Sequence, residues 1–312
     1  VVVDEQQRFG VDQRLALSQK GKNPHILSMT ATPIPRTMMM ANYGEMDVSV
    51  IREKPKNRLE IQTKIVSQER LNEVTKGIKK FLDLGQKVYW VCPLIEESEV
   101  LDFTHVTERF SYLEQFYPKR VGLIHGRMKG IEKDIVMDQF SRGNLDIVIA
   151  TTVIEVGVDV PSATLMVIEN AERFGLSQLH QLRGRVGRGA QQSMCILLYG
   201  ENVSTIARRR LEILRESNDG FFIAEEDLKL RGGGELMGTK QAGLPRYRFA
   251  NFNCDDPRAR KLQQELLRLA NKAAHEIIDE YPDLKGCPQA ENLIMLMRLF
   301  DKEEAIKYRR TG

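Results

Sequence analysis

Short apolar runs alternate with stretches of helical period from about residue 86 to residue 200. The runs are rich in β-branched residues and read "KVYWVCPL", "VGLIH", "LDIVIATTVI", "ATLMVIEN" and "SMCILLYG". Alternation of this kind is typical of βαβ units, in which helices cover a parallel sheet. The central part of the chain is therefore predicted to be an α/β domain.

The segment 67–85, "SQERLNEVTKGIKKFLDLG", shows the helical part of this pattern. Its apolar positions fall on one face at helical spacing: Leu71, Val74, Ile78 and Phe81 or Leu82. Ser67 can cap the first turn, and Gly85 suits a left-handed stop. We expect this helix to pack on a sheet edge formed by "KVYWVCPL", after a charged linker within residues 53–66.

After Gly200 the strand pattern ends. "VSTIARRRLEILRES" and "DGFFIAEEDLKL" predict two helices joined at "NDG", which makes a helical hairpin. The following "RGGGELMGTKQAGLP" is too rich in glycine for a regular helix. A long amphipathic helix is then predicted for "PRARKLQQELLRLANKAAHEIIDEY". Its residues at core spacing are Leu262, Leu266, Leu269 and Ala273.

The chain opens with "VVVDEQQRFG", where three β-branched residues lead into Asp4 and Glu5. This pattern predicts a buried strand that delivers both carboxylates to its carboxyl end, where ligands of open α/β sheets bind. There an Asp can hold Mg²⁺ on a nucleotide, and a Glu can orient and deprotonate the attacking water. An acidic turn after an edge strand is the alternative interpretation.

A second strand is predicted for "HILSMTAT", and it ends at "TATPIPRT", residues 30–37. Proline cannot continue a strand ladder, so Pro33 and Pro35 mark its end. Small hydroxyl residues here, such as Thr32, can bond the carboxylates of the first strand. A loop that merely ends at proline is the alternative.

The segment "ATTVIEVGVDVPSA", residues 150–163, is a third candidate for binding. Thr151 and Thr152 end a predicted strand and can offer hydroxyl and N–H groups to a phosphate. Gly157 permits a backbone turn, and Asp159 can bond a ribose hydroxyl. The alternative is that threonine here reflects only its preference for strands.

The segment "QLHQLRGRVGRG", residues 178–189, is the most specific of these motifs. If it is helical, one face carries Gln181, Arg185 and Arg188, and the opposite, core-facing side carries Leu179, Leu182 and Val186. Guanidinium groups on one stripe can neutralise charge on a transferred phosphoryl group. A solvated basic face is the alternative, but glycines would only cost such a helix about 1 kcal/mol each unless close approach is needed.

Composition limits the classes that these motifs can serve. With 312 residues and 42% hydrophobic content, the chain is long enough for two or three compact domains. The net charge of +3 is too small to indicate a nucleic-acid partner by itself. Its four cysteines are far apart, so neither a zinc site nor a disulfide framework is indicated. No apolar run approaches the roughly 18 residues of a membrane span, and we expect a cytoplasmic protein without membrane contact or structural metal.

The order and spacing of DEQQ, TATP, the threonine-rich strand with "GVDVP", and "QLRGRVGR" resemble motifs II, III, V and VI of superfamily 2 helicases. The segments "DEQQRFGV", "TATPIPRT", "VYWVCPLIEESE", "GLIHGRMK", "ATTVIEVGVDVP", "QLHQLRGRVGRG" and "SNDGFFIAEEDLKLRGGGELMGTKQAG" are similar to the RecG family of branch-migration helicases. The resemblance covers essentially the whole chain.

This resemblance implies an ATP-dependent DNA helicase, an ATP hydrolase that translocates on double-stranded DNA. Its function would be branch migration and fork reversal in DNA recombination and repair, with ATP and Mg²⁺ as cofactors. It would act on branched double-stranded DNA as a monomer. The related transcription-repair coupling translocase shares part of the pattern and remains an alternative.

The resemblance also implies roles for individual residues. Asp4, with Mg²⁺, and Glu5 would serve nucleotide hydrolysis, and Gln181, Arg185 and Arg188 would contact the γ-phosphate. Nucleotide binding would involve Gly157 and Asp159. DNA binding and its coupling to hydrolysis would involve Thr32, Thr151, Thr152, Arg210, Arg231 and Gln241. Arg208, Arg209 and Arg210 form the clearest basic cluster outside the ATP site, although a solvated face explains each of them equally well.

The implied fold is a RecA-like parallel sheet flanked by helices, with a helical hairpin and a helical tail after it. Residues 1–56 would be the remnant of a first RecA-like lobe with a linker, and residues 57–200 the second lobe. Residues 201–250 would form the translocation hairpin and loop, and residues 251–312 a C-terminal helical segment.

Two residues depart from the family pattern, and one motif that ATP hydrolysis needs is absent. Gln7 stands where a His is frequent, and Gly233 where a Pro is frequent. The phosphate-binding string G-x-x-x-x-G-K-[ST] is absent, because Gly21-Lys22 is followed by Asn23. The chain by itself is therefore expected not to hydrolyse ATP, and a non-catalytic DNA- or partner-binding module is the alternative function.

Overall fold

The computed structural model describes residues 1–5, 17, 21, 24–31, 48–51, 53, 59–93, 99–151, 160–231, 256–281 and 284–299. The chain divides into two compact units. The first comprises Val1–Val48 and Glu235–Gly312, and the second comprises Ser49–Gly234. The domain boundaries expected near residues 56, 200 and 250 stay predictions.

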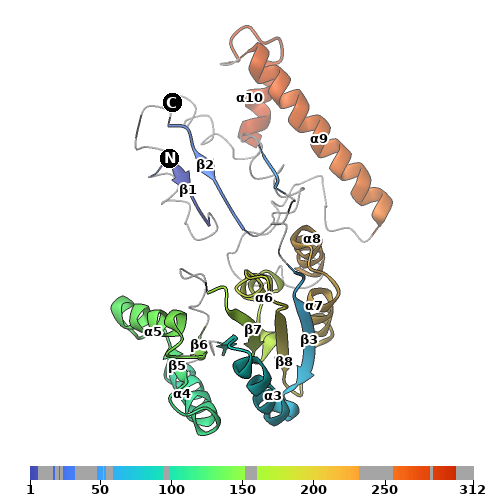
Figure 1. The fold of residues 1–312 in the computed structure, drawn as a ribbon. Helices are drawn as coiled ribbons and strands as arrows, with labels where there is room; N and C mark the ends of the chain where they lie inside the picture. Colours follow the sequence, from blue (N-terminus) through green and yellow to red (C-terminus); the bar gives the residue numbers. More distant parts are fainter. Residues whose placement is uncertain are drawn as a thin grey trace. The chain divides into compact units, whose positions relative to one another are not determined.

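The second unit is built on a six-stranded sheet in the order β3-β8-β7-β4-β6-β5, with every described pairing parallel (Figure 1). The strands are β3 (Gln62–Ser67), β4 (Lys87–Val91), β5 (Val121–Ile124), β6 (Ile147–Ala150), β7 (Ala163–Ile168) and β8 (Met194–Tyr199). The helices are α3 (Leu71–Asp83), α4 (Glu99–Phe116), α5 (Gly130–Arg142), α6 (Leu176–Arg183), α7 (Thr205–Glu216) and α8 (Gly220–Arg231). The predicted α/β class and each strand expected between residues 86 and 200 are confirmed.

Two hydrophobic clusters cover the two faces of this sheet. Successive residues of β4 alternate between them: Val88 and Trp90 lie in the cluster with α3 and α4, and Tyr89 and Val91 in the cluster with α5 to α8. All of these strand residues are buried. Because both faces are buried, the strands read as continuous apolar runs, which is the pattern that the sequence shows.

Helix α3 forms largely as its sequence predicts. The Ser67 hydroxyl accepts a hydrogen bond from the Glu69 N–H at 3.3 Å, in a short 3-10 turn before the helix. Gly85 follows the helix with φ +71°, the left-handed conformation expected of it. Ile78 and Leu82 are buried against the sheet.

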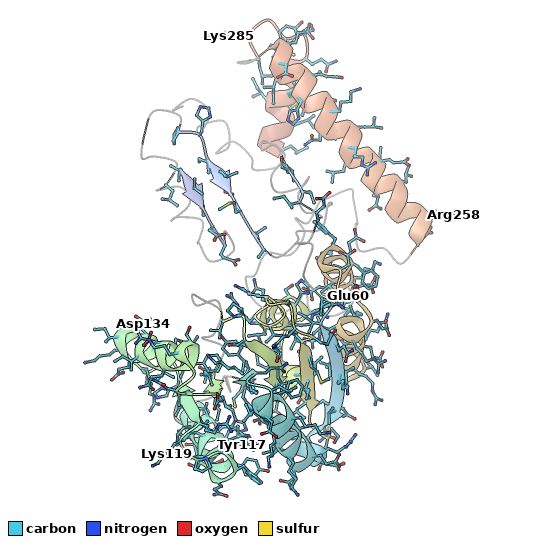
Figure 2. The ribbon with its side chains drawn as sticks, viewed as in Figure 1. Glu60, Tyr117, Lys119, Asp134, Arg258 and Lys285 are labelled. Atoms are coloured by element: carbon cyan, nitrogen blue, oxygen red, sulfur yellow. The ribbon has the colours of Figure 1, made fainter. Side chains whose placement is uncertain are left out.

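The expected place of β4 at a sheet edge is wrong. β4 pairs with β7 on one side and β6 on the other, and the edge strands are β3 and β5. The reason is that residues 62–67, which include the strand-like end of the predicted linker 53–66, join the sheet as β3 beside β8. Helix α3 still contacts β4, and Tyr117 after α4 (Figure 2) donates its hydroxyl to the Thr75 carbonyl of α3 at 2.6 Å.

The predicted helical hairpin is present as α7 and α8. The Ser204 hydroxyl caps α7 by accepting from the Ala207 N–H at 3.2 Å. Leu211, Leu214 and Ile223 are buried in the cluster that also contains the apolar face of α6. The hairpin is therefore part of the sheet unit's own core.

The first unit contains the short strands β1 (Val2–Val3) and β2 (Leu27–Ser28), and the helices α9 (Pro257–Glu280) and α10 (Ala290–Leu299). β1 and β2 are parallel, with Leu27 N–H donating to Val1 O at 2.9 Å and Met29 N–H to Val3 O at 2.8 Å. Both predicted strands are thus confirmed in part. Most of the helix-like stretch from residue 11 to residue 21 lies outside the described residues.

Helix α9, with side chains along its length from Arg258 (Figure 2), confirms the predicted long helix. Its expected core positions are wrong, because Leu262, Leu266, Leu269 and Ala273 are all exposed. Within the described part of the first unit, no element covers this stripe. Among the described helices, none is long and apolar enough to cross a membrane.

A buried carboxylate joins three elements of the sheet unit. Glu169 follows β7 with its side chain fully buried, and it accepts hydrogen bonds from Trp90 Nε1 and from Arg109 Nε and Nη2, the last at 3.0 Å. His105 Nε2 lies 3.9 Å from Glu169 Oε2, and Cys92 Sγ lies 3.8 Å from Oε1. Cys92, His105 and Glu169 have the donor types and spacing of metal ligands. Because the bidentate Arg109 already neutralises the carboxylate, we interpret this cluster as a structural ion pair between α4 and the sheet.

Replacing Arg109 tests this interpretation. Arg109→Met should lower the free energy of unfolding of the sheet unit by about 3 kcal/mol, because it leaves Glu169 buried without its partner. The measurement is urea unfolding followed by the fluorescence of Trp90, the sole tryptophan of the chain. The double variant Arg109→Met/Glu169→Gln should lose less than the single variant.

The matched control is Arg142→Met, because Arg142 pairs with Asp138 at 3.0 Å on the exposed surface of α5. Its loss should stay below about 1 kcal/mol. Equal, small losses for Arg109→Met and Arg142→Met would show that the buried pair does not stabilise the fold.

Candidate functional site

The acidic residues Asp4 and Glu5 lie directly after β1, as predicted. The Asp4 side chain is exposed, and its Oδ1 accepts a hydrogen bond from the Glu5 N–H at 2.9 Å. Glu5 has φ 51°, a left-handed conformation that is uncommon for residues other than glycine. Because β1 and β2 are parallel, their carboxyl ends meet at one edge, where Met29 and Thr30 follow β2. Thr32 lies outside the described residues.

An exposed carboxylate at the end of a strand fits a nucleotide-bound Mg²⁺. This ion is commonly held by one or two carboxylates, with phosphate oxygens and water completing its octahedron. Asp4 supplies a donor of the right type. It is therefore a chemically suitable ligand.

If the segment 178–189 were helical throughout, Gln181, Arg185 and Arg188 would lie on a single face. This condition is not met, because α6 ends at Arg183. The chain continues as a turn, with Arg185 N–H donating to Leu182 O at 3.0 Å and Val186 N–H to Arg183 O at 3.3 Å. Arg188 is exposed, and its Nε donates to Gly184 O at 3.4 Å.

Two glycines of this segment lie where the neighbouring atoms leave no room for a side chain. Gly187 has φ +77°, and a Cβ there would lie 2.9 Å from Ile61 Cγ1. A Cβ on Gly189 would lie 2.7 Å from the Pro161 carbonyl oxygen. Contacts this short exclude a side chain, so the requirement for close approach is confirmed at both positions. The predicted buried face is also confirmed, since Leu179, Leu182 and Val186 are buried.

Sequence reasoning missed Arg183, the most buried arginine of the segment. Only 2% of its surface is exposed. It sits at helical spacing from Leu176 and Leu179, both of them buried, and this spacing was the signal that could have placed it on the core side. Its hydrogen bonds reach the C-terminus of α7.

Thr151 directly follows β6 at the carboxyl edge of the large sheet. Its N–H donates to Ile124 O at 3.3 Å, and its buried hydroxyl has no hydrogen-bond partner among the described residues. A buried hydroxyl without a partner is costly unless a ligand or neighbouring segment satisfies it. Thr152, Gly157 and Asp159 lie outside the described residues.

A basic group that received no specific role from the sequence follows β5 at the same edge. His125 comes directly after the strand, with Arg127 and Lys133 nearby. Burial, and then the charges of these two cations, lower the pKa of His125 from its usual value. Cations at this edge can attract phosphate groups without reading base sequence.

Arg210 is half-buried, and its guanidinium group contacts the protein. Its Nη1 donates to Phe174 O at 2.9 Å, just before α6, and its Nε is buried without a partner among the described residues. Arg209 pairs on the surface with Glu212 and Glu216 at 3.6 and 3.5 Å, and Arg208 is exposed. The three arginines therefore do not form one surface cluster. Arg231 is the last residue of α8, and its side chain is not among those that the structure describes. Gln241 lies outside the described residues.

Polar contacts fasten α6 to both helices of the hairpin. Arg183 reaches the end of α7, and the Ser177 hydroxyl donates to the buried Asp227 of α8 at 2.8 Å. Arg210 of α7 donates a hydrogen bond to the carbonyl of Phe174, in the segment before α6. The turn that carries Arg185 and Arg188 thus extends from a helix that is bonded to the hairpin at several points.

Sequence comparisons identify known proteins that are similar to this chain. Residues 74–190 match the family described as Helicase conserved C-terminal domain, and residues 217–307 match the one described as ATP-dependent DNA helicase RecG, domain 3, C-terminal. The chain is 48% identical over 304 residues to an ATP-dependent DNA helicase RecG of Synechocystis, covering 97% of this chain and 35% of the relative. It is also 48% identical over 288 residues to that of Escherichia coli K12, covering 90% of this chain and 40% of the relative.

Solved structures give the same result. A structure of RecG bound to a three-way DNA junction aligns with a TM-score of 0.64 and 45% identity, covering 86% of this chain and 33% of that one. A variant of S. cerevisiae Dbp5 bound to RNA and ADP BeF3 shares the fold, with a TM-score of 0.51 and 17% identity, covering 70% of this chain and 56% of that one. The chain thus spans between a third and about two fifths of the length of its RecG relatives. Over 86–97% of its length the chain is thus similar to part of proteins named ATP-dependent DNA helicase RecG.

Proposed function

We propose that this chain supplies the second RecA-like lobe and the translocation hairpin of an ATP-dependent motor on double-stranded DNA. The motor would drive branch migration and fork reversal in DNA recombination and repair, as a monomer in the cytoplasm. The observation that carries the proposal is the direct bonding of α6, which leads into the arginine turn, to the hairpin α7–α8. Such a motor requires a segment that changes position with the bound nucleotide and that is attached to the helices that move along DNA.

The proposed roles in ATP hydrolysis fall to two groups of residues, one acidic and one largely basic. Asp4 would hold Mg²⁺, which when bound neutralises charge on the phosphate oxygens. Glu5 would orient the attacking water and accept its proton. Gln181, Arg185 and Arg188 would contact the γ-phosphate, where guanidinium groups stabilise charge in the transition state.

The nucleotide and DNA contacts complete the proposal. Gly157 and Asp159 would accommodate the ribose, and Thr32, Thr151 and Thr152 would contact DNA phosphates or relay the nucleotide state. The buried hydroxyl of Thr151, which has no hydrogen-bond partner among the described residues, supports a ligand at that edge of the sheet. Since the aligned RecG structure is bound to a three-way DNA junction, we propose branched double-stranded DNA as the ligand here.

Coupling between hydrolysis and movement would depend on the hairpin. Arg210, Arg231 and Gln241 are the proposed coupling residues. The bond from Arg210 to Phe174 O supports a role inside the protein, because it joins α7 to the segment before α6. Gln241 would contact the DNA from the loop after α8.

The first test replaces the outer arginine of the turn in a protein extended upstream to the length of its relatives. Arg188→Ala should reduce ATP turnover with branched duplex DNA by at least about 10³-fold, because it removes a charge that stabilises the transition state. Binding of the same DNA should stay unchanged. Arg142→Ala, at an exposed position on α5, is the matched control and should leave turnover intact.

Normal turnover by Arg188→Ala would remove this residue from the catalytic site. Absence of ATP turnover by the extended protein itself would favour the alternative, a non-catalytic DNA-binding module.

The second test separates hydrolysis from movement. Gln241→Ala in the extended protein should keep ATP turnover within about threefold of the parent, since it leaves the phosphate contacts in place, but should slow fork reversal at least about tenfold. The measurement pairs a phosphate-release assay with conversion of a labelled fork. Normal fork reversal by this variant would contradict the role of the loop.

A further inference from the structure

Arg183 is a buried cation at the junction of three elements. It is the last residue of α6, and only 2% of its surface is exposed. Its guanidinium group lies between the C-terminus of α7 and the edge strand β3. A side chain that is usually exposed thus fills a site in the protein interior.

The contacts of Arg183 converge on the end of α7. Its Nη1 donates to Leu214 O at 2.6 Å and to Ser217 O at 2.9 Å, with a longer contact to Thr63 Oγ1 at 3.3 Å. Its Nη2 lies 3.1 Å from His180 Nδ1. The last carbonyls of a helix have no partners within that helix, and they form the negative end of its dipole. Arg183, which belongs to α6, therefore satisfies backbone carbonyls that lie without intrahelical partners at the C-terminus of α7.

The charge of Arg183 is balanced differently from that of Arg109. None of the described ion pairs includes Arg183, whereas Arg109 is paired with Glu169. Burial lowers the pKa of Arg183 from the usual value of arginine. A desolvated cation that binds mainly carbonyl groups stabilises the fold poorly compared with an apolar side chain, and buried ionic groups can instead specify one arrangement of elements.

The position of Arg183 along the chain gives this arrangement a consequence. Arg183 comes two residues before Arg185, at the start of the turn that carries both arginines of the proposed ATP site. Its acceptor Ser217 begins the short connection between α7 and α8. Ser177–Asp227 and Arg210–Phe174 join α6 and its approach to other points of the hairpin. Of these three described contacts, only that of Arg183 reaches a residue of the connection between α7 and α8, namely Ser217.

We propose that Arg183 is a positioning residue that transmits displacement of the arginine turn to the connection between α7 and α8. Without it, the turn responds to ATP while the hairpin follows incompletely, so that hydrolysis continues with less movement per ATP. This inference rests on the proposed function, because it requires a motor that hydrolyses ATP and moves along DNA.

The test measures coupling in the upstream-extended protein. Arg183→Met keeps the length and apolar stem of the side chain and removes its hydrogen bonds. ATP turnover with forked DNA should stay within about threefold of the parent, and the number of base pairs moved per ATP should fall at least about tenfold. Arg183→Lys retains the cation without the planar fork and should fall between the two.

Lys87→Met is the matched control for loss of a buried cation. Lys87 is also buried, and its Nζ donates to the carbonyls of Phe140 and of Ser141, the latter at 2.7 Å, near the end of α5. Its contacts involve neither α6 nor the hairpin. Lys87→Met should therefore lower the urea midpoint of Trp90 fluorescence while leaving base pairs per ATP unchanged.

The outcomes separate the claims. If Arg183→Met keeps the parental ratio, or if Lys87→Met lowers the ratio equally, Arg183 is a structural residue and the inference is wrong. If Arg183→Met does not fold, the ratio of Arg183→Lys decides, and a parental ratio overturns the inference. If the parent neither hydrolyses ATP nor moves DNA, the proposed function itself fails, and the inference fails with it.

Discussion

The rest of the sheet unit depends on the burial of both faces of one parallel sheet. Six parallel strands need connections that cross over the faces, and these connections supply the helices that exclude water from both sides. The same constraint brings the carboxyl ends of all six strands to one edge. Thr151 after β6, His125 after β5 and Glu169 after β7 therefore gather there, although they are separated along the chain.

Buried cations at helix C-termini are the second recurring feature. Lys87 binds carbonyls near the end of α5, and Arg183 binds carbonyls at the end of α7. Each places a positive charge on the negative end of a helix dipole and satisfies carbonyls that the helix leaves open. The two sites differ in what they join. Lys87 anchors a helix to its own sheet, whereas Arg183 joins α6 to the hairpin and so connects two parts of the proposed mechanism.

The fold could be predicted where apolar periodicity decided it. The alternating runs gave the strands of the sheet, and the cap at Ser67 and the stop at Gly85 gave α3. The order of strands could not be obtained in this way, because periodicity says which face a residue occupies and not which strand lies beside it. For the same reason the strand-like end of the predicted linker 53–66 could not be identified as the edge strand β3.

The site was predictable in its residue types and less so in its geometry. Helical spacing identified the buried face of Leu179, Leu182 and Val186, but it gave no sign that α6 ends at Arg183 and that a turn follows. Arg183 was overlooked because a charged residue among charged neighbours is ordinarily exposed. Its role depends on carbonyl groups of residues 214 and 217, and backbone acceptors leave no signature in a sequence.

The central claim is that α6, with its arginine turn, and the hairpin move as one body. Spin labels at the exposed positions Gln178 of α6 and Glu225 of α8 test it most directly, by double electron–electron resonance on the upstream-extended protein with forked DNA. The account predicts one unchanged distance distribution without nucleotide, with a non-hydrolysable ATP analogue and with ADP. A distribution that shifts between these states would contradict it.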